Sequence, residues 1–147
     1  MVVLPADHYI ENVEAFVHDI VEGITHVIKE NIVLYGIEPI APETKYGYIV
    51  PNPNGVWFRE KPDAITALEL IKQKALWNSG IFAAHVDLIL KCLRNSQYSI
   101  MDWVTSPREG KAPSFDVAVL QEHKHIIVWG GTGVMLVPGI HSLLFLK

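Results

Sequence analysis

The sequence predicts an α/β domain in which a mixed, mostly parallel sheet is flanked by helices. Residues 2–4 and 32–37 are short apolar runs of the kind that form buried strands. Between them, apolar side chains recur at spacings of three and four, the period of one helix face: Val13, Phe16, Val17, Ile20, Val21, Ile24, Val27 and Ile28. Strand, helix and strand in this order form a βαβ unit, which normally joins two parallel strands.

Local signals set the bounds of the individual elements. The first helix should run from about Val13 to Glu30, with Asn12 as its N-cap. A hairpin follows, because two strand-like runs flank the turn sequence PNPNG. The further elements that we expect are strands at 46–50, 56–60, 80–84 and 126–129 and helices at 63–74, 86–93 and 115–122.

Length and composition exclude several classes of protein. The chain has 147 residues, of which 50% are hydrophobic and 19% charged, so it can form one domain with a core. Its net charge of −4, without a basic stripe, argues against nucleic acid as a partner. Membrane insertion is not expected, because no apolar run approaches the roughly 20 residues that span a bilayer. The single cysteine, Cys92, forms no intrachain disulfide and fits a reducing cytoplasm.

Three short patterns combine residue types that bind ligands: PADH at 5–8, ETKYGYI with REKP at 43–62, and LWNSGIF at 76–82. Each has a structural explanation when taken alone, as a turn cap, a strand glycine or a solvated ion pair. Together they form a binding set. An aspartate at a strand end can hold a divalent metal, and a glycine lets a ligand approach the backbone closely. Carboxylate, amide and ammonium groups suit sugar hydroxyls and a phosphate.

Five segments in this order resemble the bacterial mannose-1-phosphate guanylyltransferases: VLPADHYI…EAF, YGIEPIAPETKYGYI, REKP, LWNSGIF and PSFDVAVLQE. The resemblance covers roughly residues 2–129 and extends to the bifunctional type fused to a mannose-6-phosphate isomerase domain. It implies an incomplete nucleotide-diphospho-sugar transferase fold, which is Rossmann-like. The family joins mannose 1-phosphate to GTP, giving GDP-mannose and pyrophosphate, and Mg²⁺ neutralises much of the phosphate charge.

The resemblance also implies roles for individual residues. Asp7 would be a catalytic residue and the metal ligand, and Lys61 would be catalytic through the phosphate. The substrate-binding residues would be His8, Gly47, Glu60 and Asn78. Asp116 matches an aspartate of the family, but we assign it no firm role.

The chain departs from the family pattern at both ends. The family's first strand and glycine-rich phosphate loop would lie upstream of Met1, so we expect them to be lacking and the nucleotidyltransferase domain to be partial. Residues 1–132 are family-like and residues 133–147 diverge. The sequence GVMLVPG at 133–139 is the one-nucleotide-shifted translation of the family segment WSDVGSW written in ordinary codons. We therefore expect a frameshifted tail, in which Leu136 occupies the position of the second metal-binding aspartate.

Two hypotheses about function follow. The first is a mannose-1-phosphate guanylyltransferase by descent whose isolated chain is inactive. The second is a non-catalytic remnant that binds sugar phosphate or self-associates. A second copy of the chain or a complementary N-terminal fragment would cover apolar surface beside the lacking strand. A zinc site at His123 and His125 is the remaining alternative, but no third ligand is suitably spaced.

Overall fold

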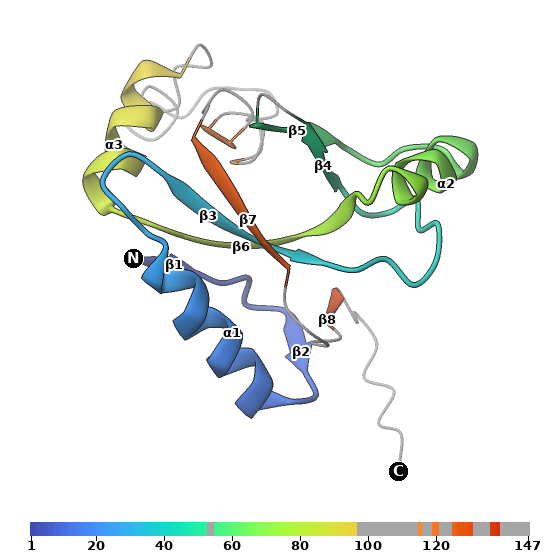
Figure 1. Ribbon diagram of the computed structural model, residues 1–147, viewed down its shortest axis with the longest axis horizontal. Helices are drawn as coiled ribbons and strands as arrows, with labels where there is room; N and C mark the ends of the chain where they lie inside the picture. Colours follow the sequence, from blue (N-terminus) through green and yellow to red (C-terminus); the bar gives the residue numbers. More distant parts are fainter. Residues whose placement is uncertain (53–54, 97–114, 116–118, 121–124, 131–135, 139–147) are drawn as a thin grey trace, which may run out of the picture.

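Figure 1 shows the computed structural model, which describes residues 1–52, 55–96, 115, 119–120, 125–130 and 136–138. The helices are α1 (Val13–Thr25), α2 (Ala64–Lys72) and α3 (Val86–Asn95). The strands are β1 (Val2–Val3), β2 (His8–Ile10), β3 (Ile32–Ile37), β4 (Tyr48–Asn52), β5 (Gly55–Arg59), β6 (Leu76–Ala84), β7 (Ile126–Gly130) and β8 (Leu136–Pro138). The expected α/β class is confirmed.

The main sheet is mixed, with strand order β5–β4–β6–β3–β7 and β1 paired to β6. The expectation that it is mostly parallel is wrong for the described strands, among which β3 and β7 form the one parallel pair. The reason is β6, which runs antiparallel to β1, β3 and β4. Because β1 and β3 both oppose β6, they run in the same direction, as a βαβ unit requires, but β6 lies between them.

The helices lie on both faces of this sheet (Figure 1). Along β3, the side chains of Ile32 and Leu34 belong to a core cluster with α3, whereas Val33 and Tyr35 belong to a cluster with α1. This alternation is the period of a strand that is buried on both faces. A third cluster joins α2 to β4 and the start of β6.

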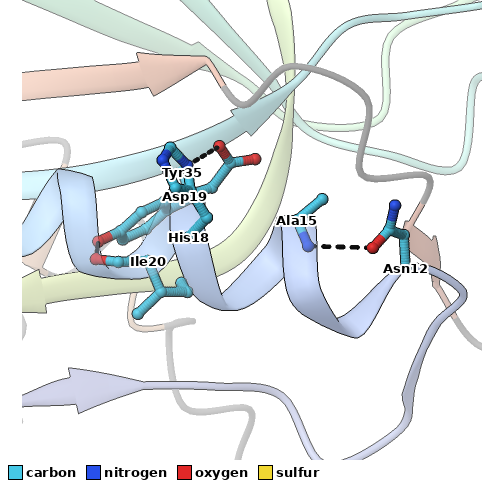
Figure 2. Close-up of polar contacts among 6 residues, drawn as sticks. All are labelled: Asn12, Ala15, His18, Asp19, Ile20 and Tyr35. Atoms are coloured by element: carbon cyan, nitrogen blue, oxygen red, sulfur yellow. Dashed lines mark hydrogen bonds and ion pairs between the residues drawn. The ribbon is translucent and has the colours of Figure 1, made fainter.

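Helix α1 begins where the sequence predicts and ends earlier. The Asn12 side chain accepts a hydrogen bond from the Ala15 amide at 3.0 Å, which confirms it as the N-cap (Figure 2). The helix ends at Thr25 rather than near Glu30, and the buried Asn31 side chain holds the turn that follows. Asn31 accepts from the Ile28 amide and donates to the His26 carbonyl, both at 2.8 Å.

Four further expectations can be compared with the structure. The hairpin is confirmed as β4 and β5, and the predicted strand at 126–129 is β7. The strand predicted at 80–84 starts at Leu76 and is therefore almost twice as long. The run at residues 2–4 is not fully buried, since Leu4 is 52% exposed. Asp116, His123 and most of the helix predicted at 115–122 lie outside the described residues. Within the described part, no helix has the length and apolar character to cross a bilayer.

Candidate functional site

The candidate site is organised by an irregularity in β6. Tyr35 pairs with Ile81, but the next residue of β3, Gly36, pairs with Asn78, so Ser79 and Gly80 are extra residues on β6. Gly80 has φ +71°, a conformation that glycine adopts without the strain imposed by a Cβ. The Ser79 hydroxyl donates to the Tyr35 carbonyl and accepts from the Ile81 amide, replacing interrupted ladder bonds. Such bulges re-aim a side chain, and here the side chain is Asn78.

Asn78 is held against the loop that precedes β4. Its backbone amide donates to the Gly47 carbonyl at 2.8 Å, and its Oδ1 accepts from the Gly80 amide at 3.1 Å. A Cβ added to Gly47 would lie 3.7 Å from the Asn78 Cβ and only 2.6 Å from Glu60 Oε2. Three predicted residues from three separate segments therefore meet at one place, and the small size of Gly47 makes room for the carboxylate.

Lys61 completes this group from the end of β5. Its ammonium lies 3.9 Å from Glu60 Oε1, and both side chains are more than half exposed. Lys61 has φ +42°, in the left-handed region that costs a side-chain-bearing residue about 1–2 kcal/mol. Strained backbone of this kind concentrates at ligand-binding sites. The two carboxylate oxygens of Glu60 have different neighbours: Oε1 faces the Lys61 ammonium, and Oε2 lies beside the Gly47 backbone.

Aromatic and acidic side chains that the sequence analysis did not single out support the loop at 43–47. The Tyr46 ring meets Trp77 edge-on, with centroids 5.0 Å apart. The Tyr48 hydroxyl donates to the Glu43 carbonyl at 2.8 Å, and Glu43 Oε1 accepts from the Thr44 and Lys45 amides. Burial, together with the Glu43 charge, raises the pKa of Tyr46, so its phenol stays protonated at neutral pH. The two tyrosines that flank Gly47 in the sequence YGY were the signal from which this aromatic support could have been predicted.

The PADH segment approaches the same end of β6. A Cβ on Gly80 would lie 3.3 Å from Pro5 Cγ, so the turn that carries Asp7 lies beside the bulge that positions Asn78. Asp7 is exposed, and its carboxylate can supply one ligand to a metal. Among the described residues no three histidine, cysteine, aspartate or glutamate side chains are grouped to hold a metal ion. A metal here would therefore take its other ligands from phosphates and water, as Mg²⁺ commonly does.

His8 is half-buried at the start of β2, which pairs with β8 so that Pro138 lies opposite His8. Its Nδ1 atom is buried and has no hydrogen-bond partner among the residues that the structure describes. Burial lowers the pKa of His8 from 6.5, and the nearby Asp7 charge opposes this shift only partly. His8 is therefore neutral at pH 7.

We predict that mild acidification weakens the fold through His8. Because the folded-state pKa is lower than the unfolded-state value, the unfolded chain binds the proton first as the pH falls. The contribution of His8 is complete above about pH 6.5 and is lost as the pH falls toward the folded-state pKa. Urea midpoints measured without metal between about pH 7.5 and 5.5 test this. His8→Gln should flatten that part of the profile, and an unchanged slope in the variant would contradict the assignment.

A pocket of about 490 Å³ lies elsewhere, at the opposite end of β6. Its lining comes from the start of α3 and from the segments before β3 and β7: Lys29, Glu30, His85, Asp87, Leu88, Lys91 and His125. None of the residues predicted for the site lines it. Four of the predicted residues, Gly47, Glu60, Lys61 and Asn78, are instead grouped around the exposed Glu60 carboxylate.

Comparisons with known proteins identify the family to which this chain belongs. The family described as "Nucleotidyl transferase" matches residues 1–133, so the chain belongs to the nucleotidyl transferase family.

Within this class, the chain is similar to mannose-1-phosphate guanylyltransferase of Escherichia coli, with 31% identity over 87% of this chain and 34% of the relative. It is 32% identical to the alginate biosynthesis protein AlgA of Pseudomonas fluorescens, over 83% of this chain and 27% of the relative. It is 36% identical to the xanthan biosynthesis protein XanB of Xanthomonas campestris pv. campestris, over 75% of this chain and 25% of the relative. The resemblance found in the sequence motifs is confirmed. The chain spans about a third or less of the length of these relatives.

Solved structures show the same fold. A Thermus thermophilus structure, described as a mannose-1-phosphate geranyltransferase, superposes with a TM-score of 0.76 at 25% identity, over 92% of this chain and 45% of that one. A Helicobacter pylori structure, described as a mannose-6-phosphate isomerase, superposes with a TM-score of 0.78 at 24% identity, over 92% of this chain and 62% of that one. The second likeness concerns the fold alone. Together they support the Rossmann-like fold expected from the motifs.

Proposed function

We propose that this chain forms the sugar-phosphate-binding part of a mannose-1-phosphate guanylyltransferase, which converts GTP and mannose 1-phosphate to GDP-mannose and pyrophosphate. The supporting observation is the convergence of Gly47, Glu60 and Asn78, with the Lys61 ammonium 3.9 Å from the Glu60 carboxylate. A carboxylate and an amide are suited to the hydroxyls of a sugar, and an ammonium to a phosphate. The similarity to guanylyltransferases favours mannose over other hexoses.

Each residue has a proposed role in that reaction. Glu60 and Asn78 bind mannose hydroxyls, Gly47 lets the sugar phosphate approach the backbone, and Lys61 neutralises the phosphate that attacks GTP. Mg²⁺, when bound, stabilises the charge of the transferring phosphoryl group. Asp7 is the ligand we propose for it, with His8 held neutral beside Asp7.

We further propose that the chain alone binds mannose 1-phosphate without catalysing the transfer. The residues that are grouped are those proposed to bind the sugar phosphate, and the resemblance implies that Leu136 stands where the second metal-binding aspartate is expected. A leucine side chain cannot ligate Mg²⁺. Two assays separate binding from turnover: calorimetric titration with mannose 1-phosphate, and GDP-mannose formation from GTP, mannose 1-phosphate and Mg²⁺. Product above a metal-free blank would disprove inactivity, whereas absence of sugar-phosphate binding would disprove the proposed site.

Lys61 offers a matched test, because Lys74 shares its left-handed backbone, with φ +61°, but lies just after α2. Lys61→Gly and Lys74→Gly should each leave stability within about 0.5 kcal/mol of the parent, since relief of strain offsets the chain entropy of glycine. Only Lys61→Gly should weaken mannose 1-phosphate binding, by about tenfold or more, because a charge-assisted hydrogen bond contributes about 1.5–3 kcal/mol. Equal affinities of the two variants would exclude Lys61 from the phosphate site.

A further inference from the structure

The loop at 43–47 is fixed at its first residue by the core of the domain. The Glu43 amide donates to the Ala41 carbonyl at 2.9 Å, and the Glu43 carbonyl accepts from the Tyr48 hydroxyl at 2.8 Å. Tyr48 is fully buried in the cluster that joins α2 to β4, so its hydroxyl has a set position. The backbone of Glu43 is therefore anchored, although its side chain is only half-buried.

The Glu43 side chain determines the path of the next two residues. Its Oε1 atom accepts from the Thr44 amide at 2.9 Å and from the Lys45 amide at 3.1 Å. Hydrogen bonds to an ionised acceptor are roughly twice as strong as those between neutral groups. One carboxylate oxygen thus holds two successive backbone N–H groups in place, in a segment that belongs to no strand.

The other end of the loop reaches the candidate site. Tyr48 of β4 pairs with Trp77 of β6. The bond from the Asn78 amide to the Gly47 carbonyl, at 2.8 Å, continues this pairing by one residue beyond β4. Gly47 also lies beside Glu60, because an added Cβ would approach Oε2 of that carboxylate to 2.6 Å. A shift of the loop would therefore move Gly47 relative to both of its neighbours in the site.

We propose that Glu43 is a positioning residue of the sugar-phosphate site, whose carboxylate holds the loop in the conformation in which Gly47 meets Asn78. This inference rests on the mannose 1-phosphate binding proposed above. The amides of Thr44 and Lys45 lie at the surface, so water can replace the carboxylate and the loop can open while the sheet stays folded. Glu43 should therefore control affinity more than stability.

Amide hydrogen exchange followed by NMR tests the positioning without a ligand. Glu43→Ala should accelerate exchange of the Asn78 amide by about tenfold or more, because its acceptor, the Gly47 carbonyl, is no longer held. Glu43→Gln keeps one acceptor oxygen and should exchange at nearly the parent rate. The Ile81 amide, which donates to the Ser79 hydroxyl inside the bulge, should be unaffected in both variants. An unchanged Asn78 rate in Glu43→Ala would overturn the proposal.

Calorimetric titration with mannose 1-phosphate tests the consequence for binding. Glu43→Ala should lower the affinity by about tenfold with a urea midpoint close to that of the parent, and Glu43→Gln should bind like the parent. Glu38→Ala is the matched control, because it removes the same charge from an exposed position shortly before the loop. It should also bind like the parent. Equal losses in Glu43→Ala and Glu38→Ala would show that net charge sets the affinity, which would overturn the positioning role.

The two measurements separate this inference from the proposed function. If the parent chain does not bind mannose 1-phosphate but Glu43→Ala accelerates Asn78 exchange, the proposed function fails and the role of Glu43 in holding the loop stands. If the parent binds and Glu43→Ala binds equally well, the positioning role fails and the site stands. Glu43→Gln as weak as Glu43→Ala would mean that the charge of Glu43 acts on the ligand directly, which also overturns the positioning role.

Discussion

Replacing Gly23 with alanine should lower the free energy of unfolding by about 2–3 kcal/mol. A Cβ at this position would overlap the Tyr35 ring, at 2.6 Å from Cε1 and 2.7 Å from Cζ, and that ring is buried between α1 and β3. The clash would also separate the Tyr35 hydroxyl from the Ile20 carbonyl, to which it donates at 2.8 Å (Figure 2). The higher helix propensity of alanine offsets only about 1 kcal/mol of this loss.

Urea unfolding measures this loss, and two comparisons define its cause. Glu22→Ala, at the exposed neighbouring position, should change stability by less than about 0.5 kcal/mol. Tyr35→Phe removes the ring substituent nearest to the new methyl group, so the double variant should lose less than the sum of the single losses. An additive double variant, or a Gly23→Ala protein as stable as the parent, would show that α1 does not pack on Tyr35 as described.

The same interface contains the acidic side chain of Asp19, whose Oδ1 atom lies 3.8 Å from His18 Nδ1 (Figure 2). Asp19 is 8% exposed, and its Oδ2 atom has no hydrogen-bond partner within the described part of the chain. Burial raises the pKa of Tyr35, and the Asp19 charge adds to that shift, so the phenol stays protonated and continues to donate to Ile20. A buried polar atom without a partner costs about 1–3 kcal/mol. The contact between α1 and the sheet is therefore less stable than its apolar residues alone would make it.

Elements specified by local interactions could be predicted from the sequence. Asn12 caps α1 through a bond to a residue three positions away, and the hairpin of β4 and β5 is set by its turn. The position of β6 could not be predicted, because periodicity does not state which strand lies between β1 and β3. The exposure of Val17 could not be predicted either, since Val17 and Ile20 have the same apolar character in the sequence and differ only in what lies opposite them.

The candidate site shows the same division between local and long-range information. The order of the motifs indicated that Gly47, Glu60, Lys61 and Asn78 belong together, and the structure brings these four into one group. The bulge in β6 that brings them together could not be predicted from the sequence. Asn78 reaches Gly47 because Ser79 and Gly80 are extra residues opposite β3, and that mismatch exists only when two strands far apart in the sequence are paired. Asp7 belongs to the turn after Pro5, which lies beside Gly80.

Replacing Gly47 with alanine should separate binding from folding. A Cβ at Gly47 would lie 2.6 Å from Glu60 Oε2, but that atom ends a flexible side chain that is 58% exposed, so it can move away. Stability should therefore change by less than about 1 kcal/mol. Mannose 1-phosphate affinity should fall by about tenfold to a hundredfold, because the displaced carboxylate loses charge-assisted hydrogen bonds to the sugar of about 1.5–3 kcal/mol.

A double-mutant cycle with Glu60→Ala shows whether the loss acts through the carboxylate. If alanine at position 47 weakens binding by displacing Glu60, the same substitution should have little further effect once Glu60 is gone. Calorimetric affinities of the parent, the two single variants and the double variant complete the cycle. Additive losses would mean that the new methyl group blocks the sugar phosphate directly and that the position of Glu60 is irrelevant. Parent-like affinity in Gly47→Ala would remove both residues from the site, because a bound sugar phosphate cannot share the space that the new methyl group and the displaced carboxylate occupy.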